Sequence, residues 1–123
     1  MTEINIFKHS KDAVAVEAGE LLFQEGDQGD DMFAVVDGEI DLLRDGLIVE
    51  TVGAGGILGE LALIDPAPRS AEAKVRTAAR VVRIDKRQFT FLVHEHPTFA
   101  LQVMTVMAER LRKTNEGIGS HDG

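Results

Sequence analysis

The 123-residue chain contains no cysteine, tryptophan or tyrosine, and phenylalanine supplies all of its aromatic side chains. Without cysteine, the protein can form neither a disulfide nor a thiolate metal site. The N-terminal segment, MTEINIFKHS, lacks the basic start and the apolar centre of a secretory signal. We therefore expect a cytoplasmic protein.

A long hydrophobic run and an excess of basic residues are also missing. The longest nearly apolar stretch, Phe99 to Ala108, is far shorter than the ~20 residues that span a bilayer. The net charge of −8 repels nucleic acid and anionic membranes. We expect no direct binding to nucleic acid and no insertion into a membrane, so an anionic ligand would need a local site.

The composition that is present, 44% hydrophobic and 28% charged, is typical of a globular protein, and the length fits a single domain over residues 1–123. Between residues 12 and 85, short apolar segments alternate with glycine turns, which predicts strands. Asp37-Gly38 and Asp45-Gly46 are dipeptides typical of hairpin turns. We predict a mainly β fold, an antiparallel β-roll or jelly roll of about eight short strands. The clearest strands are Met32–Val36, Glu39–Leu43, Leu47–Val52, Ala71–Val75 and Ala79–Ile84.

Two C-terminal helices are predicted after Asp85, over about residues 86–116, because the apolar period changes to three or four there. Pro97 separates them. The second helix carries a broad apolar face, and cations gather at its C-terminal end, where they complement the helix dipole. Residues 117–123 are small and polar, so we expect them to fray.

The segment with the clearest functional signal runs from Gly53 to Ala71 and reads GAGGILGELALIDPAPRSA. Its glycines let the backbone approach a ligand closely. Residues 59–64 predict a short helical turn whose first amides are available to a phosphate. Arg69, nine residues after Glu60, has the planar fork that binds phosphate through two hydrogen bonds.

This segment resembles the phosphate-binding cassette of the cyclic-nucleotide-binding domain family, whose pattern is Gly-Glu-Leu-Ala-Leu, a variable link, then Arg-Ser/Thr-Ala. GELALIDPAPRSA is similar throughout, and its spacing looks like that of protein kinase A regulatory subunits and nucleotide-gated channels more than that of the catabolite activator. The earlier turn EGDQGDDMF, with Gly38 after it, resembles a second family feature. The two matches together cover the whole roll.

The resemblance implies a role for each matching residue. Glu60 would accept from the ribose 2′-hydroxyl, and Arg69 would neutralise the cyclic phosphate. Ser70 and the backbone amides around Gly59, Leu61 and Ala62 would assist Arg69. The purine would lie against apolar residues near Leu58 and Ala71, with Arg110, Arg112 and Asn115 of the last helix as candidate base contacts. Ser70 favours cAMP, with cGMP the alternative; no further cofactor is expected.

Other chemistry finds little support in the sequence. The acidic turn EGDQGDD lacks the alternating ligands of an EF-hand, and His94 and His96 lie beside Pro97 as a surface pair. The expected strands contain no histidine, unlike those of metal-dependent cupins. Ser70 has no histidine nearby in sequence, so no nucleophile and base can be assembled. We expect no metal and no enzymatic activity.

The expected mechanism is regulatory. Capture of the phosphate would pull the cassette inward and let the last helix close over the base, since a ligand shifts an equilibrium by its preference for one state. The readout would require an effector protein or an output domain beyond this chain. As an alternative, the apolar face of the last helix serves mainly to form a dimer, which makes the chain an interaction module with a vestigial or re-purposed pocket.

Overall fold

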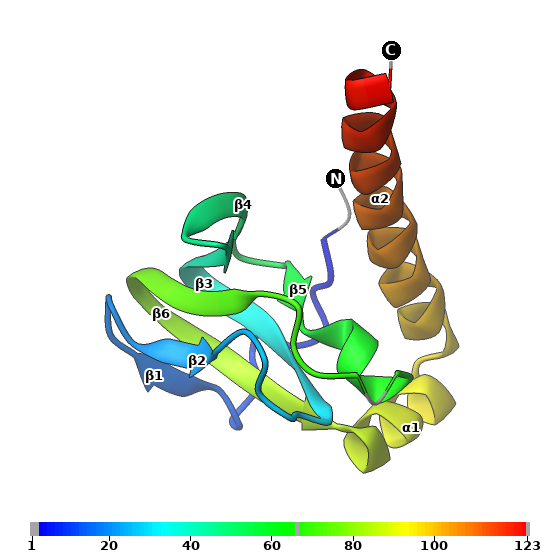
Figure 1. Cartoon of the computed structure of the whole chain (residues 1–123). Helices are drawn as coiled ribbons and strands as arrows, with labels where there is room; N and C mark the ends of the chain where they lie inside the picture. The colour runs from blue at the N-terminus through cyan, green and yellow to red at the C-terminus, as the bar shows by residue number, and fades with distance from the viewer. Residues whose placement is uncertain (1–2, 66, 123) are drawn as a thin grey trace.

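The computed structural model describes residues 3–65 and 67–122, with the backbone alone for 114–122. It is a mainly β fold: an antiparallel sheet curls into a roll, and two helices follow it (Figure 1). The described elements are β1 (Val14–Val16), β2 (Leu21–Phe23), β3 (Asp31–Arg44), β4 (Leu47–Val52), β5 (Ile57–Leu58), the 3-10 helix η1 (Glu60–Leu63), β6 (Glu72–Asp85), α1 (Lys86–Glu95) and α2 (Pro97–Asp122).

Two long strands, β3 and β6, form the spine of the roll and pair with each other along their whole lengths. Their register shifts three times between Val35 and Ile40, and such bulges bend a strand and increase its twist. At the bend, Gly38 has a φ of 83°, and a Cβ there would lie 2.5 Å from the carbonyl oxygen of Ala78. Only glycine fits this close approach.

This bend corrects two sequence predictions. Asp37-Gly38 is not a hairpin turn but a bulge inside β3, because its positive φ serves to kink one continuous strand. The two strands expected on either side of it therefore form one, as do the two expected within residues 71–84. The described part of the chain has six strands rather than about eight.

The second turn, Asp45-Gly46, is confirmed as a hairpin between β3 and β4. Arg44 pairs with Leu47, so the loop has two residues, and both have positive φ, 53° for Asp45 and 79° for Gly46. Positive φ at both central residues matches the right-handed twist of the flanking strands. The short strands complete the roll: β1 and β2 pair with β6, and β5 pairs with β3.

The hydrophobic residues form two cores. An inner core fills the roll, and an outer core lies between the roll, the N-terminal segment and the helices. Phe99 of α2 is fully buried in the outer core, where its ring lies 5.7 Å from that of Phe7 and 5.5 Å from that of Phe89. The start of α2 is therefore fixed to both the roll and α1.

The helices begin where the sequence indicates. Asp85 caps α1 by accepting from the amide of Gln88, whose side chain accepts from the amide of Asp85 in return. Pro97 opens α2, a position where its missing N–H costs nothing. The end of α2 differs from the prediction, since the helix continues past residue 116 to Asp122. Glycine in a helix costs only about 1 kcal/mol and does not by itself end it.

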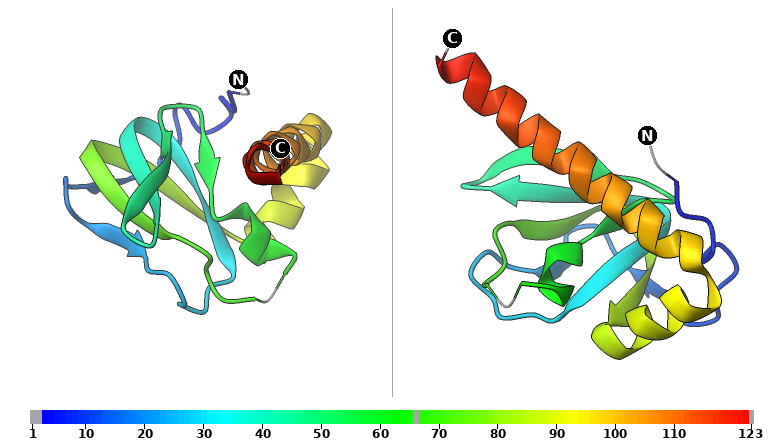
Figure 2. Two further views of the ribbon diagram at one scale, coloured as in Figure 1. Left: turned by 45° about the horizontal axis from the view of Figure 1, so that its top comes forward. Right: turned by 90° about the vertical axis from the view of Figure 1, so that its right-hand side faces the viewer.

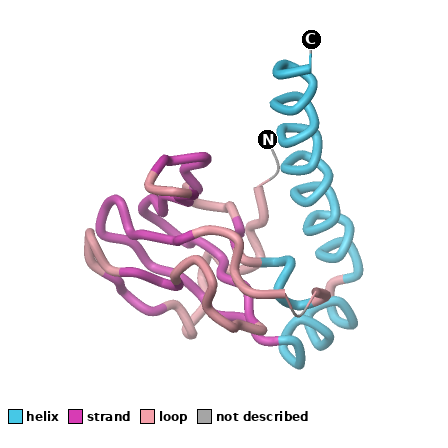
Figure 3. The backbone as a smooth tube through the Cα atoms, viewed as in Figure 1, coloured by secondary structure: helices cyan, strands magenta, loops and turns pink. Residues whose placement is uncertain are grey.

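From its base beside α1, α2 runs past the open side of the roll and extends beyond it (Figure 2). Helices lie on one side of the molecule and strands on the other, with η1 between them (Figure 3). Among the described helices, none is long and apolar enough to cross a membrane.

Candidate functional site

The cassette predicted from the sequence connects β5 to β6 and lies on the side of the roll that faces α2 (Figure 1). Gly59, between β5 and η1, has a φ of 74°, and a Cβ at this position would lie 2.6 Å from Nη1 of Arg69. Glycine is thus required twice, for its backbone conformation and for the space that the arginine occupies. The turn brings Glu60 and Arg69 to the same end of the roll.

Arg69 is buried at 8% exposure, and its guanidinium is held by the backbone around it. Its Nη1 donates to the carbonyl oxygen of Gly59 at 3.1 Å, and its Nη2 donates to the carbonyl oxygen of Asp31 at 2.7 Å and to Asp31 Oδ1 at 2.9 Å. The guanidinium carbon lies 4.2 Å from the centre of the Phe23 ring. These contacts fix the orientation of the fork before any ligand arrives.

One donor of this fork has no partner. The Nε of Arg69 is buried and finds no hydrogen-bond acceptor in the described part of the chain. An unsatisfied buried donor costs about 1–3 kcal/mol. Gly29 packs closely against this nitrogen, because a Cβ there would lie 2.6 Å from Nε, so no larger residue fits beside the fork. The arrangement suits an acceptor that comes from outside, such as a phosphate oxygen.

The charge of Arg69 is balanced by Asp31, which also pairs with a second arginine. Asp31 Oδ2 lies 2.8 Å from Nε of Arg83, an exposed side chain. Burial lowers the pKa of the Arg69 guanidinium from its ordinary value, and the Asp31 carboxylate opposes this shift. Asp27 adds a second carboxylate near Arg69, and its carbonyl oxygen accepts from the Arg69 amide at 2.8 Å, so two arginines and two aspartates gather at this end of the roll.

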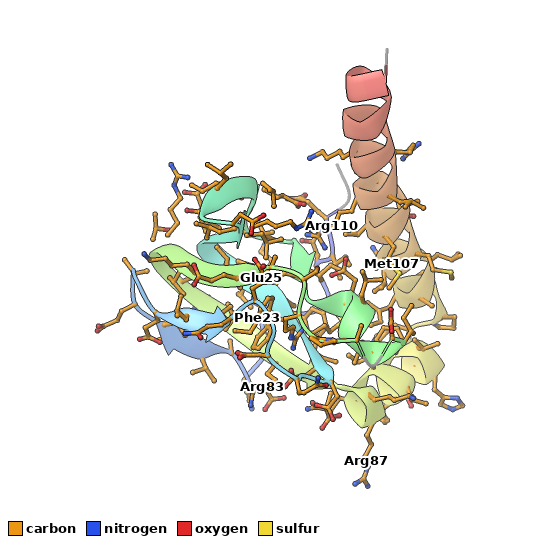
Figure 4. The ribbon with its side chains drawn as sticks, in the orientation of Figure 1. Phe23, Glu25, Arg83, Arg87, Met107 and Arg110 are labelled. Atoms are coloured by element: carbon orange, nitrogen blue, oxygen red, sulfur yellow. The ribbon has the colours of Figure 1, made fainter. Side chains whose placement is uncertain are left out.

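Glu60 is also buried, at 3% exposure, and its partner comes from the last helix. Nη1 of Arg110 donates to Glu60 Oε1, and Nη2 of Arg110 donates to the carbonyl oxygen of Ile57 at 2.6 Å. Glu50 of β4 receives two further bonds from Arg110, both of 3.0 Å. Burial opposes the charge of Arg110, but the two carboxylates outweigh it and raise its pKa. Figure 4 shows Arg110 at the side of α2 that faces the roll.

The comparison with protein families agrees with this geometry, because the model of the family described as "Cyclic nucleotide-binding domain" matches residues 13–96. The chain belongs to the cyclic nucleotide-binding domain family. The matched range contains the whole cassette and the acidic turn before β3.

Among curated relatives, the CRP-like cAMP-activated global transcriptional regulator of Mycobacterium tuberculosis is 30% identical over 105 residues, with 81% of this chain and 47% of the relative covered. The chain thus spans about half the length of the curated relatives that it matches. The relative is by name a transcriptional regulator.

Solved structures show the same fold. The Thermus thermophilus catabolite activator protein matches with a TM-score of 0.77 at 24% identity, over 86% of this chain and 52% of that one. PKAR CBD2, solved with Sp-2Cl-cAMPS bound, matches with a TM-score of 0.71 at 28% identity, over 87% of this chain and 70% of that one.

Within this cyclic nucleotide-binding domain, the remaining cassette residues lie in different settings. Leu58 is fully buried in the inner core, and Ala71 is 8% exposed. Their place beside the purine stays a prediction. Ser70 is exposed, and its carbonyl oxygen accepts from Arg44. The amide of Ala62 already donates to the carbonyl oxygen of Gly59 at 3.2 Å. This bond lies within the turn, and the expected contact of the amide with a phosphate stays a prediction.

The three candidate base contacts on the last helix differ in their placement. Arg110 reaches the site, as described above, but its structural partners are Glu50, Glu60 and a backbone carbonyl. Arg112 is exposed. The side chain of Asn115 lies outside the described residues. Leu61, the other residue predicted near the phosphate, is 56% exposed on η1.

No group of three or more acidic residues, histidines or cysteines in the described part of the chain could hold a metal ion. A hollow of about 570 Å³ lies beside the cassette, between the turn at Gln28 to Asp30 and Lys86 at the start of α1. Ala62 lines it, but neither Glu60 nor Arg69 does, so we give it no part in the nucleotide site.

Proposed function

We propose that this domain is a sensor that binds a cyclic nucleotide, cAMP in preference to cGMP. The observation that carries the proposal is the buried guanidinium of Arg69, whose Nη1 and Nη2 are held by the chain and whose Nε finds no acceptor within the described part of it. A cyclic phosphate oxygen placed at this donor would satisfy it with a charge-assisted hydrogen bond. The cAMP named in the description of the M. tuberculosis relative supports the same ligand.

The second recognition element is Glu60, which the family resemblance assigns to the ribose. Its buried carboxylate uses Oε1 for Arg110 in the described contacts, so Oε2 is the oxygen that would accept from a 2′-hydroxyl. Arg69 and Glu60 together would read phosphate and sugar, and the base would lie toward the apolar residues near Leu58 and Ala71. Ser70 in the cassette favours cAMP over cGMP.

Calorimetric titration of the purified, nucleotide-free chain with cAMP, cGMP and 5′-AMP tests the proposal directly. We expect cAMP to bind with low-micromolar or tighter affinity, cGMP more weakly, and 5′-AMP much more weakly because its phosphate is not cyclic. A folded chain that binds none of the three would contradict the assignment. Equal binding of cAMP and 5′-AMP would show that the cyclic phosphate is not what the site recognises.

The output that we propose is a change in the position of α2. Arg110 connects this helix to Glu60, so a ligand that binds at Glu60 acts on the residue that α2 holds. The ligand can shift α2 only by its difference in affinity for the two positions. An effector protein or an output domain would read the change, in accord with the greater length of the curated relatives.

A second candidate function, dimerisation through α2, is favoured by a stripe of exposed apolar side chains. Leu101, Met104 and Leu111 are 63%, 54% and 63% exposed, and Ala108 is exposed between the last two. Their spacing of three, four and three residues is that of the a and d positions in a coiled coil. The buried face of α2, with Phe99, lies elsewhere on the same helix.

Replacing Met104 by Glu tests this interface, because it places a charge in the apolar seam without touching the buried face. We expect the parent chain to sediment as a dimer and the variant to sediment as a monomer in analytical ultracentrifugation. Thr105→Glu, at the exposed neighbouring position, is the matched control and should leave the dimer intact. A parent chain that is monomeric at high concentration, with and without cAMP, would exclude this second function.

A further inference from the structure

Glu50 takes part in the contact between α2 and the roll, although nothing in the cassette pattern includes it. It pairs with Arg110 as a fork: Nε of Arg110 donates to Oε1 of Glu50, and Nη2 of Arg110 donates to Oε2 of Glu50. Bidentate pairs of this kind fix orientation as well as charge. The third nitrogen, Nη1, is then directed at Glu60.

The backbone of β4 explains how Glu50 reaches this place. Leu42 pairs with Glu50 and Leu43 pairs with Ile48, so Val49 is an extra residue that forms a bulge in β4. A bulge re-aims the side chains beside it. Glu50 also precedes the buried Val52 by two positions, and alternate residues of a strand share a face. Glu50 therefore lies on the inner face of the roll, at the end that α2 crosses.

The guanidinium of Arg110, shared by two carboxylates, offsets the cost of a buried negative charge at this site. Glu60 has only 4% of its side chain exposed, and its negative charge must coexist with the anionic phosphate at Arg69. Arg110 provides the opposite charge. If Arg110 had Glu60 alone as a partner, its fork would bind both oxygens of that carboxylate, because the bidentate geometry is preferred. The fork is instead occupied by Glu50.

Building on the nucleotide-binding function proposed above, we propose that Glu50 is a positioning residue for ribose recognition. It holds the Arg110 fork away from Glu60, so that one oxygen of Glu60 stays available to the ribose 2′-hydroxyl while α2 remains docked on the roll. Glu50 does not contact the nucleotide in this scheme. Its effect passes through Arg110, and it should appear only for ligands that carry a 2′-hydroxyl.

The test compares the affinities of cAMP and 2′-deoxy-cAMP for the parent chain and for Glu50→Gln. For the parent we expect cAMP to bind at least about tenfold more tightly, the typical effect of one hydrogen bond to a charged group. Glutamine keeps the shape of Glu50 but loses its charge, so the Arg110 fork should turn to Glu60 and occupy both oxygens. The preference for cAMP should then fall to about threefold or less, while 2′-deoxy-cAMP binds within about twofold of its parent affinity.

Two further variants separate positioning from a general effect of charge or folding. Glu39→Gln, an exposed position of β3, makes the same change in net charge and should leave the preference intact. Glu50→Asp keeps the carboxylate and should retain most of the preference for cAMP over 2′-deoxy-cAMP. If Glu50→Gln folds poorly, Glu50→Asp still tests whether a carboxylate at this position supports that preference.

The outcomes distinguish this inference from the function on which it rests. If the folded parent chain binds no cyclic nucleotide, the proposed function fails and the inference fails with it. If the parent prefers cAMP over 2′-deoxy-cAMP and Glu50→Gln keeps that preference, the inference alone is wrong. Equal losses for both ligands in Glu50→Gln would show that Glu50 supports the fold and not ribose recognition.

Discussion

Replacing Arg69 by Ala should weaken cAMP binding by roughly 10- to 150-fold, the equivalent of about 1.5–3 kcal/mol for hydrogen bonds to a charged group. The variant removes the buried guanidinium whose Nε has no acceptor among the described residues, so the phosphate would lose its cationic partner. It also leaves Asp31 with Arg83 as its only cation among the described ion pairs, which should lower stability. Calorimetric titration, preceded by circular dichroism to establish folding, measures both effects.

Two variants make this result interpretable. Arg80→Ala removes a half-exposed arginine that pairs with Asp37 on the surface, and it should bind cAMP as the parent does. Arg69→Lys retains a positive charge but lacks the planar fork, so we expect a folded protein with clearly weakened binding. Parent-like affinity of a folded Arg69→Ala variant would show that the phosphate binds elsewhere.

Replacing Phe99 by Ala should lower the free energy of unfolding by about 3–5 kcal/mol, as for other fully buried aromatic residues. Its ring is completely buried and touches Phe7 and Phe89, so the variant would leave a cavity where α2, α1 and the N-terminal segment meet. Urea denaturation followed by circular dichroism measures the change.

Phe91→Ala is the matched control, because Phe91 of α1 is 62% exposed and its loss should change stability by less than about 0.5 kcal/mol. If Phe99→Ala were as stable as Phe91→Ala, the packing of α2 described above would be incorrect. The comparison also bears on signalling, since a helix that is fixed at its base can move chiefly at its free end. Arg110 lies on that more distal part of α2.

Much of the site was accessible from the sequence because its residues are close together along the chain. Glu60 and Arg69 lie within one cassette, whose glycines and spacing carry a specific pattern, and the structure brings both to one end of the roll. The antiparallel β-roll and both helix starts followed from local signals such as Asp45-Gly46 and Pro97.

The contacts that the sequence did not reveal join residues that are far apart. Asp31 is one of two adjacent aspartates, and only the pairing of β3 with β6 decides which of them meets Arg69. Phe23 lies under the same guanidinium from a different strand. Glu50 did offer a signal, because a charged residue at an inward position of an apolar strand is costly to bury unless it is paired. The bend at Gly38 was misread because a bulge and a hairpin use the same dipeptides.

The register of the spine also bears on the order in which the two strands would pair during folding. Leu43 pairs with Glu72, across the shortest loop between β3 and β6, whereas Asp31 pairs with Asp85, across the longest. The entropy lost in closing a loop grows with its length, so pairing is cheapest to start beside the cassette and then to proceed toward Asp31. Few of these contacts are local, which places the domain among slower-folding topologies. In that order, the ion pair of Asp31 with Arg83 would form late, so the charges around the phosphate site would be completed only when the spine is nearly paired.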